Sequence, residues 1–163
     1  STLFPYTTLF RSSILYDLAK CYLELKEYQN GVDTITKAII FNTNNHEFLY
    51  LKGKILIELG KYEEALNILN RVIQINKKYS SAYFRKGICY EKLGKYEEAL
   101  ENYKKCQSFV PNDDQLSNCI GMCFVKLNKN DEALAEFKNT LKINPKNRFA
   151  IQYKDRLTKK QNN

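Results

Sequence analysis

The stretch Gly60-Lys61-Tyr62-Glu63-Glu64-Ala65-Leu66 recurs without change at residues 94–100. A diverged copy, Asn-Lys-Asn-Asp-Glu-Ala-Leu, follows at residues 128–134, so the three copies are spaced 34 residues apart. The same interval separates glycines outside the motif, namely Gly53, Gly87 and Gly121. A fixed internal period of this length predicts an array of repeats in which each unit is one supersecondary structure.

Four units account for residues 12–147: 12–45, 46–79, 80–113 and 114–147. In the third unit, apolar residues follow helical spacing on both sides of a turn at Gly94, which predicts two helices. Because glycine destabilises a helix, its recurrence inside the first helices predicts a close crossing of the two helices. The stretches 110–114 and 144–147 each contain a proline and offer an N-cap to the helix that follows.

These residues resemble the tetratricopeptide repeat (TPR) family over residues 12–147. The family has small residues at unit positions 8 and 20, supplied here by Ala19, Gly53, Gly87 and Gly121 and by Gly31, Ala65, Ala99 and Ala133. The resemblance implies an all-α fold, a right-handed superhelical solenoid of helix-turn-helix hairpins. Position 4 is often tryptophan in the family and is Ser117 in the fourth unit, where we expect looser packing.

The two ends differ from the array. Residues 148–163 are predicted to form a C-terminal capping helix and a basic tail, because Ala150, Tyr153 and Leu157 make a narrow apolar stripe among polar residues. Residues 1–12 break the pattern and resemble translated adapter sequence, so residues 1–11 are interpreted as a non-native or disordered leader and the chain as a fragment.

Charge and cysteine content favour a cytoplasmic protein in a reducing compartment. The net charge is +8, but residues 148–163 carry +4 and Arg11 one more, leaving +3 for residues 12–147. That modest excess argues against a nucleic-acid partner. The longest apolar stretch, 119–125, is too short to cross a membrane. Five cysteines, an odd number, follow no secretory signal.

We find no catalytic, metal or cofactor motif and expect a non-enzyme. Gly53 and Gly60-Lys61 lack the spacing and the hydroxyl residue of a phosphate loop, and the single histidine, His46, is interpreted as a surface residue. Unit position 10 is Cys21, Cys89 and Cys123 in three units and Ile55 in the second unit. Because cysteine replaces a large apolar residue there, we predict that these three cysteines fill the core. Cys119 and Cys123 lack a second ligand pair for zinc.

The resemblance further implies that the first helix of each unit lines a concave groove. The predicted groove residues are Tyr16, Lys20, Tyr50, Leu51, Lys54, Phe84, Arg85, Ile88, Asn118 and Met122. Aromatic residues at position 5 beside lysines at position 9 favour a linear or helical partner segment with apolar anchors and acidic character. The alternative is that a tyrosine-rich sequence places aromatic residues at these positions without binding anything.

We therefore predict a protein–protein interaction module, an adaptor or assembly scaffold that binds another protein. The alternative is a regulatory arm of a larger enzyme, such as a glycosyltransferase, whose catalytic domain lies outside this sequence. Relatives that clamp the C-terminus of heat-shock chaperones need lysine, asparagine and arginine at five groove positions. Those positions hold Tyr16, Lys20, Leu51, Ser81 and Arg85 from the first unit, or Tyr50, Lys54, Arg85, Gln115 and Cys119 from the second. In the set counted from the first unit only Arg85 has the residue type that these relatives need, and in the other set no residue does. The sequence therefore disfavours this partner.

Overall fold

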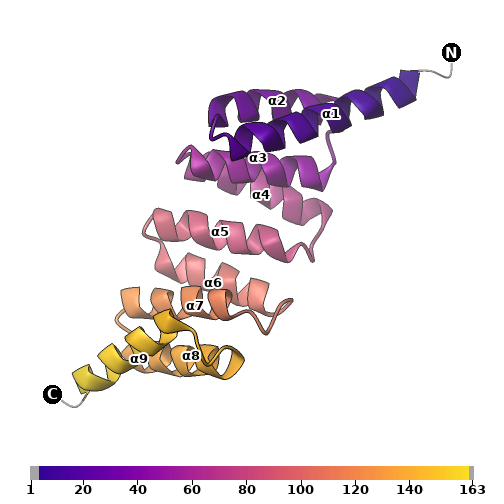
Figure 1. The fold of residues 1–163 in the computed structure, drawn as a ribbon. Coiled ribbons are helices and arrows are strands. Elements are labelled where there is room, and N and C mark those ends of the chain that lie inside the picture. The colour runs from indigo at the N-terminus through magenta and orange to yellow at the C-terminus, as the bar shows by residue number, and fades with distance from the viewer. Residues whose placement is uncertain (1–3, 162–163) are drawn as a thin grey trace. The chain divides into compact units, whose positions relative to one another are not determined.

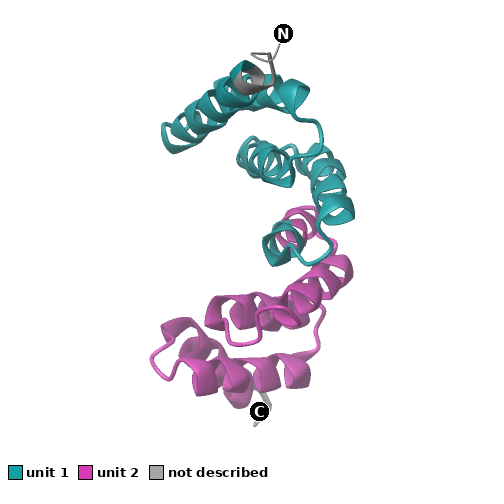
Figure 2. Ribbon diagram, turned by 90° about the vertical axis from the view of Figure 1, so that its right-hand side faces the viewer, with its two compact units in different colours: residues 1–85 teal, residues 86–163 magenta. Residues whose placement is uncertain are grey.

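The computed structural model describes residues 4–161, and within this range every regular element is an α-helix. The helices are α1 (Phe4–Glu24), α2 (Tyr28–Phe41), α3 (His46–Glu58), α4 (Tyr62–Ile75), α5 (Ser80–Lys92), α6 (Tyr96–Gln107), α7 (Asp114–Lys126), α8 (Asn130–Ile143) and α9 (Arg148–Gln161) (Figure 1). The expected all-α helical-repeat solenoid is confirmed. The chain falls into two compact parts, an N-terminal half (residues 1–85) and a C-terminal half (residues 86–163), coloured separately in Figure 2.

In the N-terminal half, successive helices pack on one another: α1 on α2, α2 on α3 and α3 on α4. One buried cluster joins Ile35 and Ala38 of α2 to Phe48, Leu51 and Ile55 of α3. Burial of such apolar side chains is the main source of stability in a repeat array, where each unit depends on its neighbour.

In the C-terminal half, α6 packs on α7, α7 on α8 and α8 on α9.

The recurrent glycines lie where two helices cross closely. A Cβ atom added to Gly121 would lie 2.7 Å from the Phe137 ring, and one added to Gly87 would overlap the Tyr103 ring. In the N-terminal half the corresponding atom on Gly53 would lie 3.0 Å from Leu69. The predicted close crossing of the two helices of a unit is confirmed.

The turn inside each unit uses a left-handed residue at unit position 15. Gly60 and Gly94 adopt φ values of +74° and +73° there. Lys26 and Asn128 take the same conformation in the first and fourth units, with φ values of 60° and 58°. Glycine adopts this conformation without steric cost, whereas lysine does not, so the first unit holds local strain that the second and third units avoid.

The predicted N-caps form in both proline-containing stretches. The Asp113 carboxylate accepts a hydrogen bond from the backbone N–H of Leu116 at 2.9 Å, and Asn147 Oδ1 accepts one from Ala150 at 3.0 Å. Each cap satisfies a backbone donor that the first turn of a helix leaves without a partner.

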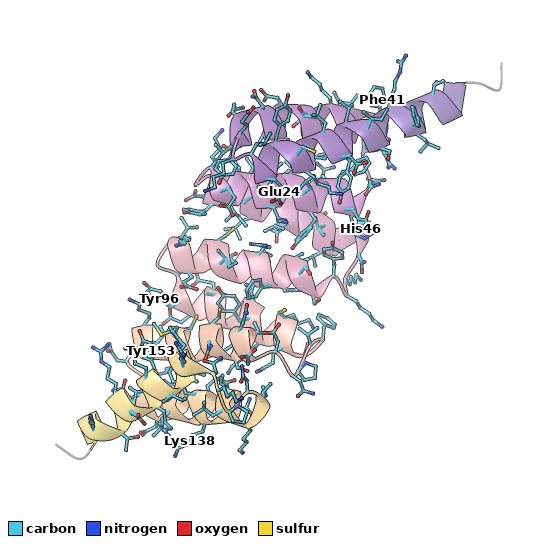
Figure 3. All side chains as sticks on the ribbon, in the orientation of Figure 1. Glu24, Phe41, His46, Tyr96, Lys138 and Tyr153 are labelled. Atoms are coloured by element: carbon cyan, nitrogen blue, oxygen red, sulfur yellow. The ribbon has the colours of Figure 1, made fainter. Side chains whose placement is uncertain are left out.

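The ends of the described chain are helical. Residues 4–11 of the expected leader continue α1 without a break, and residues 1–3 and 162–163 lie outside the described range. At the other end, Ala150 and Leu157 of α9 are buried, and the Tyr153 ring, labelled in Figure 3, stacks on Phe137 with centroids 5.3 Å apart. That the leader is non-native stays a prediction. No helix within residues 4–161 combines the length and apolarity that a membrane span needs.

The cysteines divide by their place in the array. Cys89 and Cys123 are buried, as predicted for unit position 10, but Cys21 is exposed. The prediction that Cys21 fills the core is therefore wrong. In later units the first helix is covered at this position, whereas no helix of the described chain covers Cys21 on α1. Ser117 is fully buried, and its hydroxyl has no hydrogen-bond partner in the described part of the chain.

Candidate functional site

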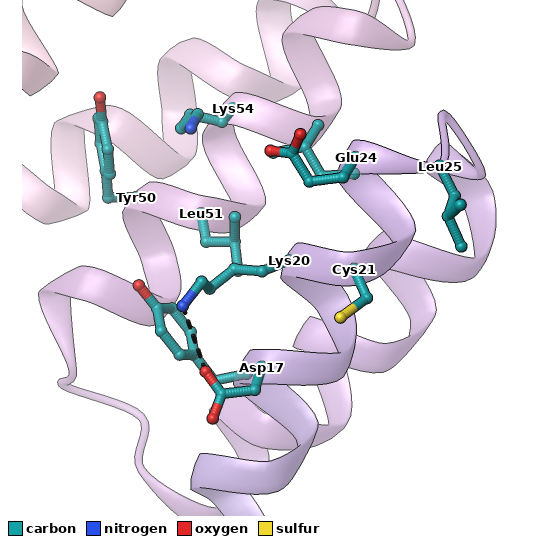
Figure 4. A pocket seen from close by; sticks show the side chains of 10 residues that line it. Asp17, Lys20, Cys21, Glu24, Leu25, Tyr50, Leu51 and Lys54 are labelled. Carbon is teal, nitrogen blue, oxygen red and sulfur yellow. Dashed lines mark hydrogen bonds and ion pairs between the residues drawn. The ribbon is translucent and has the colours of Figure 1, made fainter.

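A pocket of about 740 Å³ opens in the N-terminal half, between α1 and α3 (Figure 4). It is lined by Tyr16, Asp17, Lys20, Cys21, Leu23, Glu24, Leu25, Tyr50, Leu51 and Lys54. Half of these residues, namely Tyr16, Lys20, Tyr50, Leu51 and Lys54, are among those predicted from the sequence to line a groove. They come together because α1 and α3 are the first helices of consecutive units and present equivalent unit positions.

The lining combines apolar side chains, tyrosine rings and charged groups. Leu51 belongs to the buried core, Leu23 is half-buried and Leu25 is exposed. The Tyr16 ring stacks on Phe48 with centroids 5.1 Å apart, which holds it at the pocket wall. Burial raises the pKa of the Tyr16 phenol, and the negative charge of Glu47 adds to the effect. The phenol therefore stays protonated at neutral pH and is able to donate a hydrogen bond.

The charged groups of the pocket are balanced. Two lysines face two carboxylates, and Lys20 Nζ lies 3.2 Å from Asp17 Oδ1 in an exposed ion pair. The same ammonium lies 5.2 Å from the centroid of the Tyr16 ring. Lys54 makes no ion pair within 4.0 Å among the side chains that the structure describes. Figure 4 shows Lys54 on α3 and the Lys20–Asp17 pair on α1.

The Tyr50 ring at the pocket contacts a further aromatic side chain, Tyr79. Tyr50 contacts Tyr79 edge-on, with centroids 5.0 Å apart, and Tyr79 contacts His46 in turn at 5.2 Å. Burial raises the pKa of Tyr79. Tyr79 lies in the turn before α5, so the segment that joins two units positions the Tyr50 ring.

The other predicted groove residues do not line this pocket. Phe84 and Arg85 lie half-buried on α5 in the N-terminal half, and the Arg85 Nε atom is buried without a hydrogen-bond partner among the described residues. In the C-terminal half, Ile88 is half-buried on α5, and Asn118 Nδ2 donates a hydrogen bond to Asn147 Oδ1 at 3.2 Å. Met122 lines a smaller pocket of about 360 Å³ with residues of α9.

Sequence reasoning missed five lining residues: Asp17, Cys21, Leu23, Glu24 and Leu25. Asp17 occupies unit position 6, as the predicted groove residues Leu51 and Arg85 do, so the signal for Asp17 was present in the sequence. Cys21 and Leu25 occupy positions 10 and 14. No pattern in the sequence marks these two as part of a pocket, because the equivalent residues are buried or half-buried in the other units.

Several cysteine and tyrosine side chains of the described chain are buried, which changes their protonation. Within the described residues, no group of three histidine, cysteine or acidic side chains could hold a metal ion. Burial raises the pKa of the Cys119 thiol to about 11 and that of Cys123 to about 12, so both stay protonated and poorly nucleophilic at neutral pH. The Tyr103 hydroxyl donates a hydrogen bond to Glu91 Oε2 at 2.9 Å, and burial raises its pKa as well.

Known sequence families match two overlapping segments. The family described as tetratricopeptide repeat matches residues 12–43, and the family described as anaphase-promoting complex, cyclosome, subunit 3 matches residues 34–106. None of the curated protein sequences matches the chain significantly.

Solved structures share the fold. A crystal structure of MamA is 26% identical, with a TM-score of 0.79 over 83% of this chain and 79% of that one. YrrB, described as a TPR protein with an unusual peptide-binding site, is 22% identical, with a TM-score of 0.78 over 88% of this chain and 74% of that one. The first TPR domain of Spaghetti (RPAP3), bound to the HSP90 peptide SRMEEVD, is 23% identical, with a TM-score of 0.69 over 72% of this chain and 93% of that one.

Proposed function

This chain belongs to the tetratricopeptide repeat family, and we propose that it is an adaptor or assembly scaffold that binds a linear or helical segment of another protein in the α1/α3 pocket. The observation that carries the proposal is the pocket itself. Five residues at equivalent unit positions of α1 and α3 converge on a cavity of about 740 Å³. A cavity of this size accommodates one or two bulky side chains of a peptide.

The lining specifies the chemistry of the ligand. Leu23, Leu51 and the tyrosine rings offer apolar contact, so the ligand carries a large apolar anchor. The Lys54 ammonium, which makes no ion pair with the described side chains, is placed to receive a carboxylate next to that anchor. Because Asp17 and Glu24 balance the two lysines, we propose a ligand with one well-placed acidic residue rather than a strongly acidic tract.

The structural relatives support peptide binding in general terms. YrrB is described as having a peptide-binding site, and the RPAP3 domain was solved with a peptide bound. For this chain we do not propose the heat-shock chaperone C-terminus, because the five positions that hold it in relatives contain a single matching residue, Arg85. We propose no enzymatic activity, cofactor, nucleic-acid partner or membrane partner.

A displayed library of random peptides, selected on the full chain, tests the proposal. Selected peptides are synthesised and their affinities measured by fluorescence anisotropy. We expect Tyr50→Ala to weaken binding at least about tenfold, which is 1.4 kcal/mol. Lys54→Ala should weaken it mainly at low salt, because screening reduces the contribution of an exposed charge.

Met122→Ala provides the matched control, because Met122 shares unit position 9 with Lys54 but lies in the C-terminal half. Its affinity should equal that of the parent chain. Peptides that bind Tyr50→Ala and Lys54→Ala as tightly as the parent, with unchanged circular dichroism, would exclude the α1/α3 pocket as the binding site.

A further inference from the structure

The C-terminal half holds a second pocket, which the proposed function does not use. This cavity of about 360 Å³ is formed by α7, the turn that leads into α8, and α9. Its lining combines apolar, polar and basic side chains, namely Met122, Val125, Lys126, Asn128, Asn130, Tyr153, Arg156 and Leu157. We call it the α7/α9 pocket. Figure 3 labels Tyr153 on α9.

The α7/α9 pocket and the α1/α3 pocket use equivalent unit positions but differ in charge. Unit position 13 is Glu24 in the α1/α3 pocket and Lys126 in the α7/α9 pocket. Position 9 of the helix that follows is basic in both, Lys54 in one and Arg156 in the other. Two carboxylates balance the lysines of the α1/α3 pocket, whereas none of the described residues that line the α7/α9 pocket is acidic. The α7/α9 pocket therefore has an excess of two positive charges.

The polar groups of the α7/α9 pocket are available to a ligand. Neither Lys126 nor Arg156 makes an ion pair within 4.0 Å among the described side chains. The carboxylate next to Arg156 in the sequence, Asp155, pairs instead with Lys154 Nζ at 3.5 Å. Three more polar side chains of the lining make no hydrogen bond to the described residues: Asn128, Asn130 and Tyr153.

The two asparagines come from the diverged copy of the repeated motif. Asn128 occupies unit position 15, where the two identical copies have glycine, and Asn130 occupies position 17, where the other three units have tyrosine. Asn128 keeps the left-handed backbone of the turn, with a φ of 58°, which asparagine tolerates better than most residues. At position 130 a small carboxamide replaces a large ring. Both changes preserve the turn and bring hydrogen-bond donors to the pocket.

Packing holds the α9 wall of the pocket in place. The Tyr153 ring stacks on Phe137, with centroids 5.3 Å apart, and contacts Phe149 at 4.6 Å. Leu157 is buried, and Met122 and Val125 are half-buried. The pocket therefore offers a fixed apolar surface beside its two cations.

We propose that the α7/α9 pocket binds a phosphate monoester attached to an apolar group. A phosphate monoester carries a charge of about −1.5 to −2 at neutral pH and three acceptor oxygens, which match two unpaired cations and the neighbouring amide donors. A carboxylate has one charge and would leave one cation unmatched. Phosphorylated protein side chains and small phosphate esters share this chemistry. The site is separate from the α1/α3 pocket and does not depend on the function proposed for it.

The test is an NMR titration of the isotope-labelled full chain with phenyl phosphate, compared with benzoate and inorganic phosphate. We expect saturable shifts of the Asn128 and Asn130 side-chain amides and an affinity at least about tenfold above that of either comparison ligand. A pentapeptide with phosphotyrosine between alanines distinguishes the two sources. Tighter binding than phenyl phosphate indicates a phosphorylated protein segment, and equal or weaker binding indicates a small phosphate ester.

Variants locate the site. Lys126→Gln/Arg156→Gln should weaken phenyl phosphate binding at least about tenfold and leave the fold intact, because both side chains are exposed. Lys92→Gln/Arg148→Gln is the matched control. It removes the same charge, since Lys92 shares unit position 13 with Lys126 and Arg148 lies on α9, but neither residue lines the pocket, so it should bind like the parent. Asn130→Tyr, which restores the residue of the other units, should weaken binding without lowering the urea midpoint.

The proposal is overturned if phenyl phosphate shows no saturable binding up to about 10 mM, or binds no more tightly than benzoate. Equal binding of inorganic phosphate also overturns it, because the apolar lining would then contribute nothing. So does parent affinity in Lys126→Gln/Arg156→Gln or in Asn130→Tyr. An equal loss in Lys92→Gln/Arg148→Gln would show that binding follows the overall charge of the chain and not this pocket.

Discussion

Replacing Gly87 by alanine should destabilise the protein far more than the same change at Gly53, although both glycines occupy unit position 8. A Cβ atom on Gly53 meets the Leu69 side chain at 3.0 Å, and a small rotation of that leucine relieves the contact. On Gly87 the added atom overlaps the ring of Tyr103. That ring is fully buried and anchored by its hydrogen bond to Glu91 at 2.9 Å, so it has no free space to move into.

The magnitudes follow from these contacts. Alanine is favoured over glycine inside a helix by about 1 kcal/mol, which nearly offsets the mild contact at Gly53. At Gly87 the overlap costs about 1–3 kcal/mol as overpacking. Displacing the Tyr103 hydroxyl from a charged acceptor adds about 1.5–3 kcal/mol. We therefore expect Gly53→Ala to be within about 1 kcal/mol of the parent chain and Gly87→Ala to lose about 3 kcal/mol.

Urea unfolding followed by circular dichroism measures both variants, and Tyr103→Leu completes a double-mutant cycle. Leucine at position 103 reproduces the pair that Gly53 and Leu69 form in the second unit. The loss of unfolding free energy in Gly87→Ala/Tyr103→Leu should therefore be smaller than the sum of the two single losses by at least about 1.5 kcal/mol. The reasoning is refuted if the two glycine variants shift the urea midpoint equally, or if the two changes at 87 and 103 are additive.

Three further predictions use the same urea assay. Lys26→Gly should raise the free energy of unfolding by about 1 kcal/mol and so raise the urea midpoint, because Lys26 has a φ of 60° where the second and third units have glycine. A lower midpoint would contradict this. Because burial raises the pKa of Cys119 to about 11 and of Cys123 to about 12, the thiolates form first in the unfolded chain. Stability should thus be constant below the ordinary thiol pKa of about 8.5 and fall as the pH rises toward those values, whereas a flat midpoint up to about pH 10 would argue against their burial. Deleting residues 148–163 should lose on the order of 3 kcal/mol by uncovering α8, and deleting residues 1–11 should lose little; the reverse order would show that the leader is part of the fold.

Most of the fold could be predicted because each unit repeats the same sequence pattern of apolar, small and turn residues. The period located both helices of every unit, and the glycines at position 8 marked where the helices cross. The turn at position 15 was visible only where glycine occupies it, at Gly60 and Gly94. Lys26 adopts the same conformation because the flanking helices impose it, and no local property of lysine signals that.

Only part of the candidate site could be predicted. The lining residues Tyr16, Tyr50 and Lys54 follow from equivalent unit positions, which the sequence alone reveals. The balance of charge does not, because it depends on which carboxylates lie beside each lysine in three dimensions. Asp17 pairs with Lys20 and weakens the basic character that the lysines at position 9 predicted.

The sequence by itself determined the repeat length, the helices, their caps and the close crossings, since all of these depend on residues within one unit. Tertiary structure alone decided which faces are covered. Cys21 and Ile55 share a unit position and an apolar character, yet Ile55 is buried by α2 and Cys21 is exposed on α1. The physical reason is that burial in a repeat array is supplied by the preceding unit, so the same residue type at the same position is core or surface according to what packs against it.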